Sequence, residues 1–112
     1  MLRYGDDVVD DKAILEAGKM LAAQASSPAQ VLLFGSRARG SGRPDSDLDF
    51  LVIEDTVESK LGEMVRLRDA LPPLGVPVDV IVVARAEATE RAQRRGTLVQ
   101  RALEEGRVLV ER

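Results

Sequence analysis

The chain has 112 residues, 45% of them hydrophobic and 31% charged, a composition typical of one small globular domain rather than of a disordered chain. It contains no histidine and no cysteine, which excludes disulfides, thiolate metal sites and the common catalytic triads. The net charge of −3 argues against nucleic-acid binding. We therefore expect a single domain over residues 1–112 whose chemistry depends on carboxylates, basic side chains, hydroxyls and metal ions.

The predicted elements begin with an amphipathic helix over residues 10–25, where apolar residues recur at helical spacing. Residues 31–34 are an apolar run typical of a strand buried on both faces, and this strand ends at Gly35. A short helix over residues 36–39 follows. A turn-rich stretch then leads into a second strand over residues 47–53.

The second half of the chain begins with a predicted helix over residues 58–71. The positions that we expect on its buried side are Leu61, Met64, Val65, Leu67 and Leu71. A third strand covers residues 78–83, and two helices follow, over 86–95 and over about 97–105. Residues 108–110 could add an edge strand. This order predicts an α/β (α+β) fold in which a small mixed β-sheet is flanked by helices.

Three aspartates occupy positions where a plain core strand would not place them. Asp47 and Asp49 are two residues apart, so on a strand both side chains point to the same face. Asp79 interrupts the apolar run of another strand. Because carboxylates on one face repel each other, a divalent cation between them is the simplest explanation. The sequence therefore favours a site for Mg²⁺, with room for two ions if all three carboxylates meet.

The turn after the first strand has the features of a phosphate site. Gly35 lets a phosphate approach the backbone closely, and Ser36 adds a hydroxyl donor. Arg37 and Arg39 supply positive charge for a polyphosphate. We therefore expect nucleotide binding at Gly35, Ser36, Arg37 and Arg39.

Together these residues carry a resemblance to a known family. Gly35-Ser36, ten residues, and then Asp47-Leu48-Asp49 resembles the signature of the DNA polymerase β nucleotidyltransferase superfamily. The run from Gly35 to Gly40, with Ser46 before the aspartates, is similar to the minimal nucleotidyltransferase (MNT) branch. Asp79 matches the superfamily's third carboxylate. The resemblance implies a polymerase-β-like nucleotidyltransferase palm fold.

The resemblance also implies a reaction and roles for residues. Family members transfer a nucleoside monophosphate from a nucleoside triphosphate to a hydroxyl and release pyrophosphate. By correspondence, Gly35 and Ser36 would hold the β- and γ-phosphates of ATP, and Asp47 and Asp49 would bind two Mg²⁺ ions. Asp79 would ligate the second ion and help to deprotonate the acceptor. Such chemistry needs positioning and charge neutralisation, and no histidine.

The partner is also implied by the family. MNT proteins of this size are often paired with a HEPN-domain RNase toxin, and the MNT antitoxin transfers AMP to a tyrosine of that toxin. We therefore expect a toxin–antitoxin pair in which this chain is the antitoxin. One alternative is a non-catalytic antitoxin that neutralises its partner by occlusion. Another is a small-molecule nucleotidyltransferase whose substrate pocket is completed by an oligomer.

Simpler interpretations stay open for several charged residues. Asp47 and Asp49 alone could be solvated residues at a strand end, and Arg37 and Arg39 could be ordinary exposed arginines. A basic cluster on the helix over 86–95 is typical of a solvated helix face; its members are Arg91, Arg94 and Arg95. The sequence shows neither a signal peptide nor an apolar run of membrane-spanning length, so we expect a cytoplasmic protein with no membrane partner.

Overall fold

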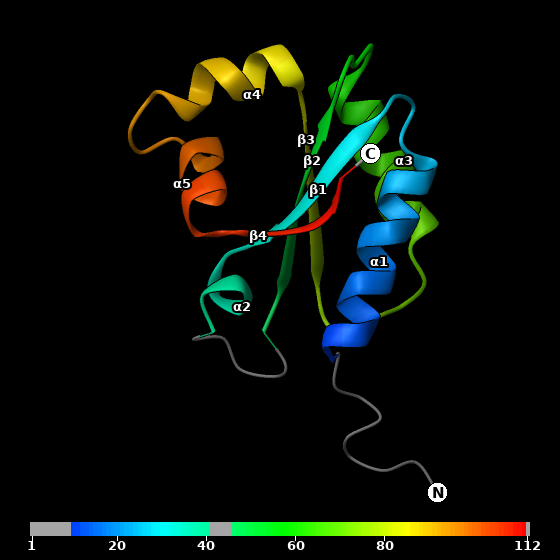
Figure 1. Ribbon diagram of the computed structural model, residues 1–112. Helices are drawn as coiled ribbons and strands as arrows, with labels where there is room; N and C mark the ends of the chain where they lie inside the picture. Colours follow the sequence, from blue (N-terminus) through cyan, green and yellow to red (C-terminus); the bar gives the residue numbers. More distant parts are fainter. Residues whose placement is uncertain (1–9, 41–45, 112) are drawn as a thin grey trace, which may run out of the picture.

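The computed structural model describes residues 10–40 and 46–111 of the chain. Within them the chain forms a four-stranded sheet and five helices (Figure 1). The elements are α1 (Asp11–Gln24), β1 (Ala29–Phe34), α2 (Ser36–Arg39), β2 (Leu48–Glu54), α3 (Lys60–Ala70), β3 (Val78–Ala84), α4 (Arg85–Ala92), α5 (Leu98–Glu105) and β4 (Arg107–Glu111). This mixed sheet with flanking helices confirms the predicted fold class.

The sheet has the strand order β3-β2-β1-β4 and is mixed. Strand β1 pairs antiparallel with both β2 and β4, whereas β2 and β3 run parallel. The parallel pair is possible because α3 returns the chain between the two strands, as in a βαβ unit. The C-terminal end of β1 and the N-terminal ends of β2 and β3 therefore meet at the same end of the sheet.

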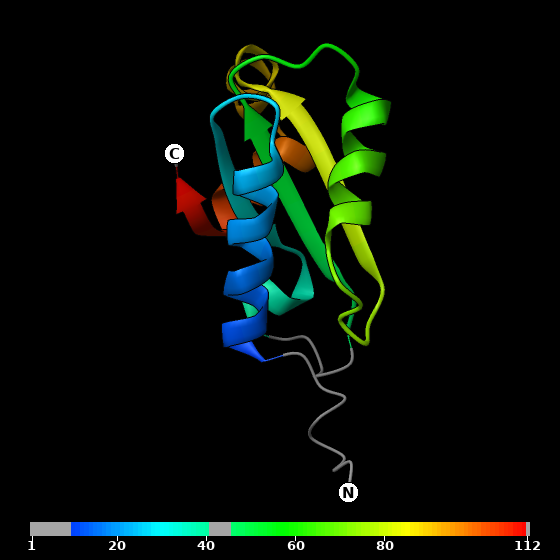
Figure 2. The same cartoon turned by 90° about the vertical axis from the view of Figure 1, so that its right-hand side faces the viewer.

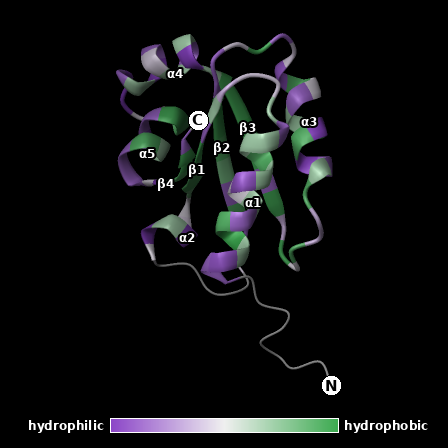
Figure 3. Cartoon of the chain, turned by 45° about the vertical axis from the view of Figure 1, so that its right-hand side comes forward, coloured by the Kyte–Doolittle hydropathy of each residue, from purple (hydrophilic) through white to green (hydrophobic). Residues whose placement is uncertain are grey.

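Helices cover both faces of the sheet. Helices α1 and α3 lie side by side on one face (Figure 2), and α4 and α5 cover the other (Figure 1). Alternate strand residues divide between the two layers, as a pleated strand requires. Colouring by hydropathy shows the most apolar segments on the strands and polar segments on the helix exteriors (Figure 3). No helix among the described residues combines the length and the apolarity that a membrane crossing requires.

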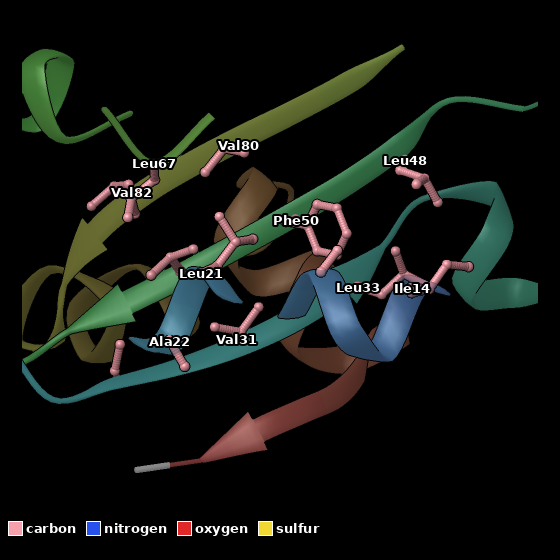
Figure 4. Packing of buried hydrophobic residues seen from close by; sticks show 13 residues of the cluster. Ile14, Leu21, Ala22, Val31, Leu33, Leu48, Phe50, Leu67, Val80 and Val82 are labelled. Atoms are coloured by element: carbon pink, nitrogen blue, oxygen red, sulfur yellow. The ribbon is translucent and has the colours of Figure 1, made fainter. Parts of the chain in front are cut away.

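The larger part of the core lies between the sheet and the helices α1 and α3. Phe50, on the central strand β2, is fully buried there (Figure 4). Aliphatic side chains surround it: Ile14, Leu21, Val31, Leu33, Leu48, Val52, Leu67, Val80 and Val82. A smaller cluster under α4 and α5 contains Leu32, Leu51, Ile53, Val83, Ala88, Val99 and Ala102. The second layer is therefore the thinner one, and the candidate site opens on that side.

Two helices differ from the sequence-based expectation. Helix α4 ends at Ala92 rather than at residue 95, because the following N–H groups bond to carbonyls only three residues back, which tightens the chain into a turn. Arg91 still pairs with Glu87 within α4, at 3.0 Å, so its position on a solvated helix face is confirmed.

In α3 the expected buried face is partly wrong. Leu67 is fully buried, but Leu61 is 72% exposed and Val65 is 52% exposed. The physical reason is Glu63, which is buried and accepts hydrogen bonds from the backbone N–H and hydroxyl of Ser26, both at 2.9 Å. Turning Glu63 inward rotates Leu61 and Val65 outward. The hydrogen bonds between Glu63 and Ser26 therefore determine how α3 is rotated about its axis.

Candidate active site

The centre of the candidate site is Asp49, the second residue of β2. In the register of the sheet, Asp49 lies opposite Phe34 of β1 on one side and opposite Asp79 of β3 on the other. Asp49 and Asp79 share the strand face that carries Leu51 further along, under α4 and α5. The two carboxylates that the sequence placed on separate strands are therefore direct neighbours.

Gly35 ends β1 beside Asp49 and has a backbone φ of +84°, which favours glycine. A Cβ atom at position 35 would lie 2.5 Å from Oδ2 of Asp49, closer than real Cβ atoms approach a neighbour. The absence of a side chain at Gly35 is thus what leaves room for the Asp49 carboxylate. Gly35 and Asp49 both belong to the sequence motif, and the sheet brings them into close contact although one follows β1 and the other lies in β2.

The electrostatics of Asp49 reflect this crowding. Burial raises the pKa of Asp49 above the ordinary value for an aspartate. The negative charges of Asp79 and Asp47 raise that pKa further, as does a hydrogen bond with the Asp79 side chain. A cation placed between these carboxylates would relieve the repulsion, so the ionised form of Asp49 is the one that a metal ion would favour.

A cavity of about 490 Å³ opens next to this carboxylate pair. Its lining comes from the end of β1, from α2, β2, β3 and α5. The lining residues are Phe34, Gly35, Arg39, Asp49, Asp79, Ile81, Gly96, Leu98, Arg101, Ala102 and Glu105. The cavity therefore has an acidic floor, with one arginine from α2 and one from α5 in its lining.

The remaining predicted site residues lie around this cavity rather than on its surface. Ser36 and Arg37 follow Gly35 in α2 and are half-buried, but they do not belong to the cavity lining. Asp47 is exposed and directly precedes β2, which begins at Leu48, so it lies outside the strand that was expected to carry it. Of the two arginines in α2, Arg39 is the one that faces the cavity.

The contribution of α5 was missed by the sequence-based prediction. Arg101 and Glu105 of this helix line the cavity, and Glu105 pairs with Arg39 at 3.3 Å. In the sequence these residues belong to an ordinary charged helix more than fifty positions after the Gly-Ser turn. No local signal could assign them to the site, since only the packing of α5 against β1 brings them there.

The donor chemistry of the site suits a hard divalent cation. Asp49 and Asp79 offer adjacent carboxylate oxygens, and Mg²⁺ is commonly held by one or two carboxylates together with substrate phosphates. Among the residues that the structure describes, no three carboxylate, histidine or cysteine side chains are grouped closely enough to hold a metal ion. The residues present therefore fit an ion that is completed by substrate oxygens.

Comparisons with known proteins show which proteins this chain is similar to. A sequence profile of the nucleotidyltransferase domain family matches residues 18–110. No curated protein matches the sequence. A candidate nucleotidyltransferase from Sulfolobus solfataricus aligns with a TM-score of 0.62 at 22% identity, covering 90% of this chain and 79% of that one.

Two further solved structures are toxin–antitoxin systems. One, with AMP-PNP, has a TM-score of 0.55 at 21% identity and covers 88% of this chain and 73% of that chain. The other, a mutant of the MntA–HpeT toxin–antitoxin, has a TM-score of 0.55 at 20% identity, with coverage of 93% and 75%. At these identities the likeness to the solved structures is a likeness of fold.

Proposed function

This chain belongs to the nucleotidyltransferase domain family, and from that premise we propose that it transfers AMP from ATP to a hydroxyl of a partner protein. The observation that carries the proposal is the contact of Gly35 with Asp49, with Asp79 alongside, at the floor of the cavity. The acceptor that we propose is a tyrosine of a HEPN RNase toxin. The structural neighbours that are toxin–antitoxin systems, one of them with AMP-PNP, support this choice.

In the proposed reaction the acceptor oxygen attacks the α-phosphorus of ATP. The bond from that phosphorus to the oxygen bridging to the β-phosphate breaks, pyrophosphate leaves, and the acceptor proton passes to the carboxylate of Asp79. Gly35 and Ser36 hold the β- and γ-phosphates, and Arg39 adds positive charge. Bound Mg²⁺, held by Asp49 and Asp79 with Asp47 nearby, would neutralise charge that develops on the phosphates.

The test is a transfer assay with labelled ATP, Mg²⁺ and the partner toxin. We expect Asp49→Asn and Asp79→Asn each to reduce transfer by at least about 100-fold, because each removes charge that stabilises the transition state. Asp11→Asn is the matched control, since Asp11 is an exposed carboxylate on α1 outside the cavity. If the Asp49 and Asp79 variants transfer label as well as the control, the proposed site is wrong.

A second candidate function is neutralisation of the toxin by binding alone. It is favoured by the position of Asp47, which is exposed, precedes β2 and does not line the cavity. It predicts that the Asp47→Asn, Asp49→Asn double variant still blocks the toxin. A toxin-activity assay with this variant separates the two candidates, because loss of neutralisation together with loss of label transfer supports catalysis.

A further inference from the structure

Helix α5 presents one whole face to the cavity. Leu98, Arg101, Ala102 and Glu105 all line it, and their spacing of three and four residues places them along one side of a helix. Figure 1 shows α5 on the same side of the sheet as α4 and α2, between these two helices. The helix is therefore a wall of the candidate site rather than a distant part of the fold.

The position of this wall is determined by backbone contacts at both ends of α5. At its start, the Thr97 hydroxyl accepts from the Gln100 N–H at 3.1 Å and donates to the Arg91 carbonyl at 3.0 Å. At its end, Gly106 packs so closely that a Cβ there would lie 2.8 Å from the Leu33 carbonyl oxygen of β1. Side chains on the inner face of α5 are thus held at a set distance from the end of β1.

The two arginines of the cavity differ in their partners. Arg39 is engaged by Glu105, with Nη1 and Oε1 3.3 Å apart. The backbone N–H of Arg101 bonds to the Thr97 carbonyl within α5, but its side chain makes neither a hydrogen bond nor an ion pair with any residue that the structure describes, although it lines the same cavity. It is exposed and sits one helical turn before Glu105. The guanidinium of Arg101 is therefore available to an anionic group that enters the cavity.

We propose that Arg101 binds the phosphate chain of the nucleotide, as a cation on α5 that faces the Gly35 turn across the cavity. This inference rests on the proposed nucleotidyltransferase function and adds a substrate-binding residue to it. A guanidinium matches a phosphate in charge and can donate two parallel hydrogen bonds to its oxygens. Arg101 thereby extends the phosphate site beyond the residues of the sequence motif.

Affinity for AMP-PNP and for adenosine, measured by NMR titration in the presence of Mg²⁺, tests the proposal. Adenosine keeps the base and ribose but has no phosphate. We expect Arg101→Ala to weaken AMP-PNP binding by about 10- to 100-fold and to leave adenosine binding unchanged, because the lost contact is a charge-assisted hydrogen bond. Arg101→Lys should recover part of the affinity, since lysine keeps the charge but not the planar fork.

Arg91→Ala is the matched control, because Arg91 is an exposed arginine that pairs with Glu87 on α4 and does not line the cavity. The proposal is overturned if Arg101→Ala binds AMP-PNP within about twofold of the control, or if it weakens adenosine and AMP-PNP equally. If wild-type protein binds no AMP-PNP, the proposed function fails too, which distinguishes that result from a failure of Arg101 alone. The spectra also report whether each variant is folded.

Discussion

At the scale of single residues, the candidate site depends on a position where a side chain is missing. Gly35 has a positive φ, and any Cβ there would meet Oδ2 of Asp49. Gly40, five residues later, also has a positive φ, of +77°, but a Cβ there would meet nothing within 4 Å. The two glycines therefore differ in what a Cβ would contact, which is the Asp49 carboxylate at position 35 and nothing within 4 Å at position 40.

We expect Gly35→Ala to reduce AMP transfer by roughly 100-fold, because displacing Asp49 misplaces the reacting groups. Gly40→Ala should leave transfer within a few-fold of wild type. Gly40→Ala should lose about 1 kcal/mol of unfolding free energy, since it forces a residue with a Cβ into a left-handed conformation. Gly35→Ala should lose more, about 1–3 kcal/mol, because φ of +84° with ψ of −164° is a combination that is almost restricted to glycine. Transfer assays and urea unfolding check these expectations, and equal activity of the two variants would contradict them.

A second residue-scale feature is the carboxyl pair of Glu54 and Glu63 on the opposite face of the sheet. Burial, with the negative charge of the neighbouring Glu63 carboxylate, raises the pKa of Glu54 to about 7. Burial alone would raise the pKa of Glu63 too, but the neighbouring Glu54 carboxyl and hydrogen bonds from the Ser26 backbone and Arg66 lower it to about 2. Below about pH 7 the folded pair therefore holds a proton on Glu54 while Glu63 is ionised.

Because the folded state holds this proton more tightly than the unfolded chain, stability should fall as the pH rises from the ordinary glutamate value of 4.5 to about 7. Glu54→Gln keeps a neutral side chain and should remove that fall, so that the variant is more stable than wild type at pH 8. Urea unfolding at pH 5 and pH 8 measures this. Glu16→Gln, an exposed change on α1, should keep the pH dependence of the wild type. If Glu54→Gln loses as much stability between pH 5 and pH 8 as the wild type does, Glu54 is not the group that holds the proton.

At the scale of secondary-structure elements, α5 owes its place to Gly106. A Cβ at this position would lie 2.3 Å from the Ala102 carbonyl oxygen and 2.8 Å from that of Leu33, and backbone atoms cannot swing aside. Gly18 in α1 is also tightly packed, but its nearest neighbour is the Leu109 side chain, 3.0 Å away. The close approach of α5 to β1 therefore requires glycine, whereas that of α1 to β4 can adjust.

We expect Gly106→Ala to lose about 1–3 kcal/mol of unfolding free energy and to weaken AMP-PNP binding, because α5 must move away from β1. Gly18→Ala should change stability by no more than about 1 kcal/mol, since the gain in helix propensity offsets the crowding of Leu109. Urea unfolding followed by circular dichroism compares them. An unaltered Gly106→Ala variant would show that α5 is not held in this way.

At the scale of the whole molecule, the two faces of the sheet do different work. The face under α1 and α3 carries the larger core around Phe50, whereas the face under α4 and α5 carries the smaller cluster and ends in Asp49, Asp79 and the cavity. Because burial and the neighbouring carboxylates raise the pKa of Asp49, keeping it ionised at neutral pH costs folding free energy. Ligands that neutralise them should therefore stabilise the entire fold.

We expect Mg²⁺ and AMP-PNP together to raise Tm by about 10 °C at a nucleotide concentration roughly 100 times Kd, since a ligand that binds only the folded state stabilises it. Either component alone should raise Tm less, because Mg²⁺ binding relies on phosphate oxygens as well as carboxylates. Chelation with EDTA should reverse the effect. Thermal unfolding measures the shift, and a nucleotide effect that persists in EDTA would argue against a metal at Asp49 and Asp79.

Much of this could be predicted from the sequence. Turns rich in glycine and proline, apolar strand runs and helical periodicity located each element found in residues 10–40 and 46–111. The Gly35-Ser36 and Asp47-Leu48-Asp49 motif identified a family that is confirmed over residues 18–110. The errors concern the end of α4, the start of β2 after Asp47 and the buried face of α3. Leu61 and Val65 have apolar side chains at helical spacing, but the inward turn of Glu63 leaves them exposed. Periodicity shows which positions of a helix are apolar. It does not show which tertiary contact holds the helix in its rotation about its axis.

By itself, the sequence determined the fold class, the family and the local chemistry of a turn and three carboxylates, because those features depend on residue type and on short spacings. The tertiary structure decided which of them meet. The parallel pairing of β2 with β3 made Asp49 and Asp79 neighbours, and the approach of α5 to β1 brought Arg101 and Glu105 into the site. Such contacts between distant segments follow from packing of whole elements, which no local pattern encodes.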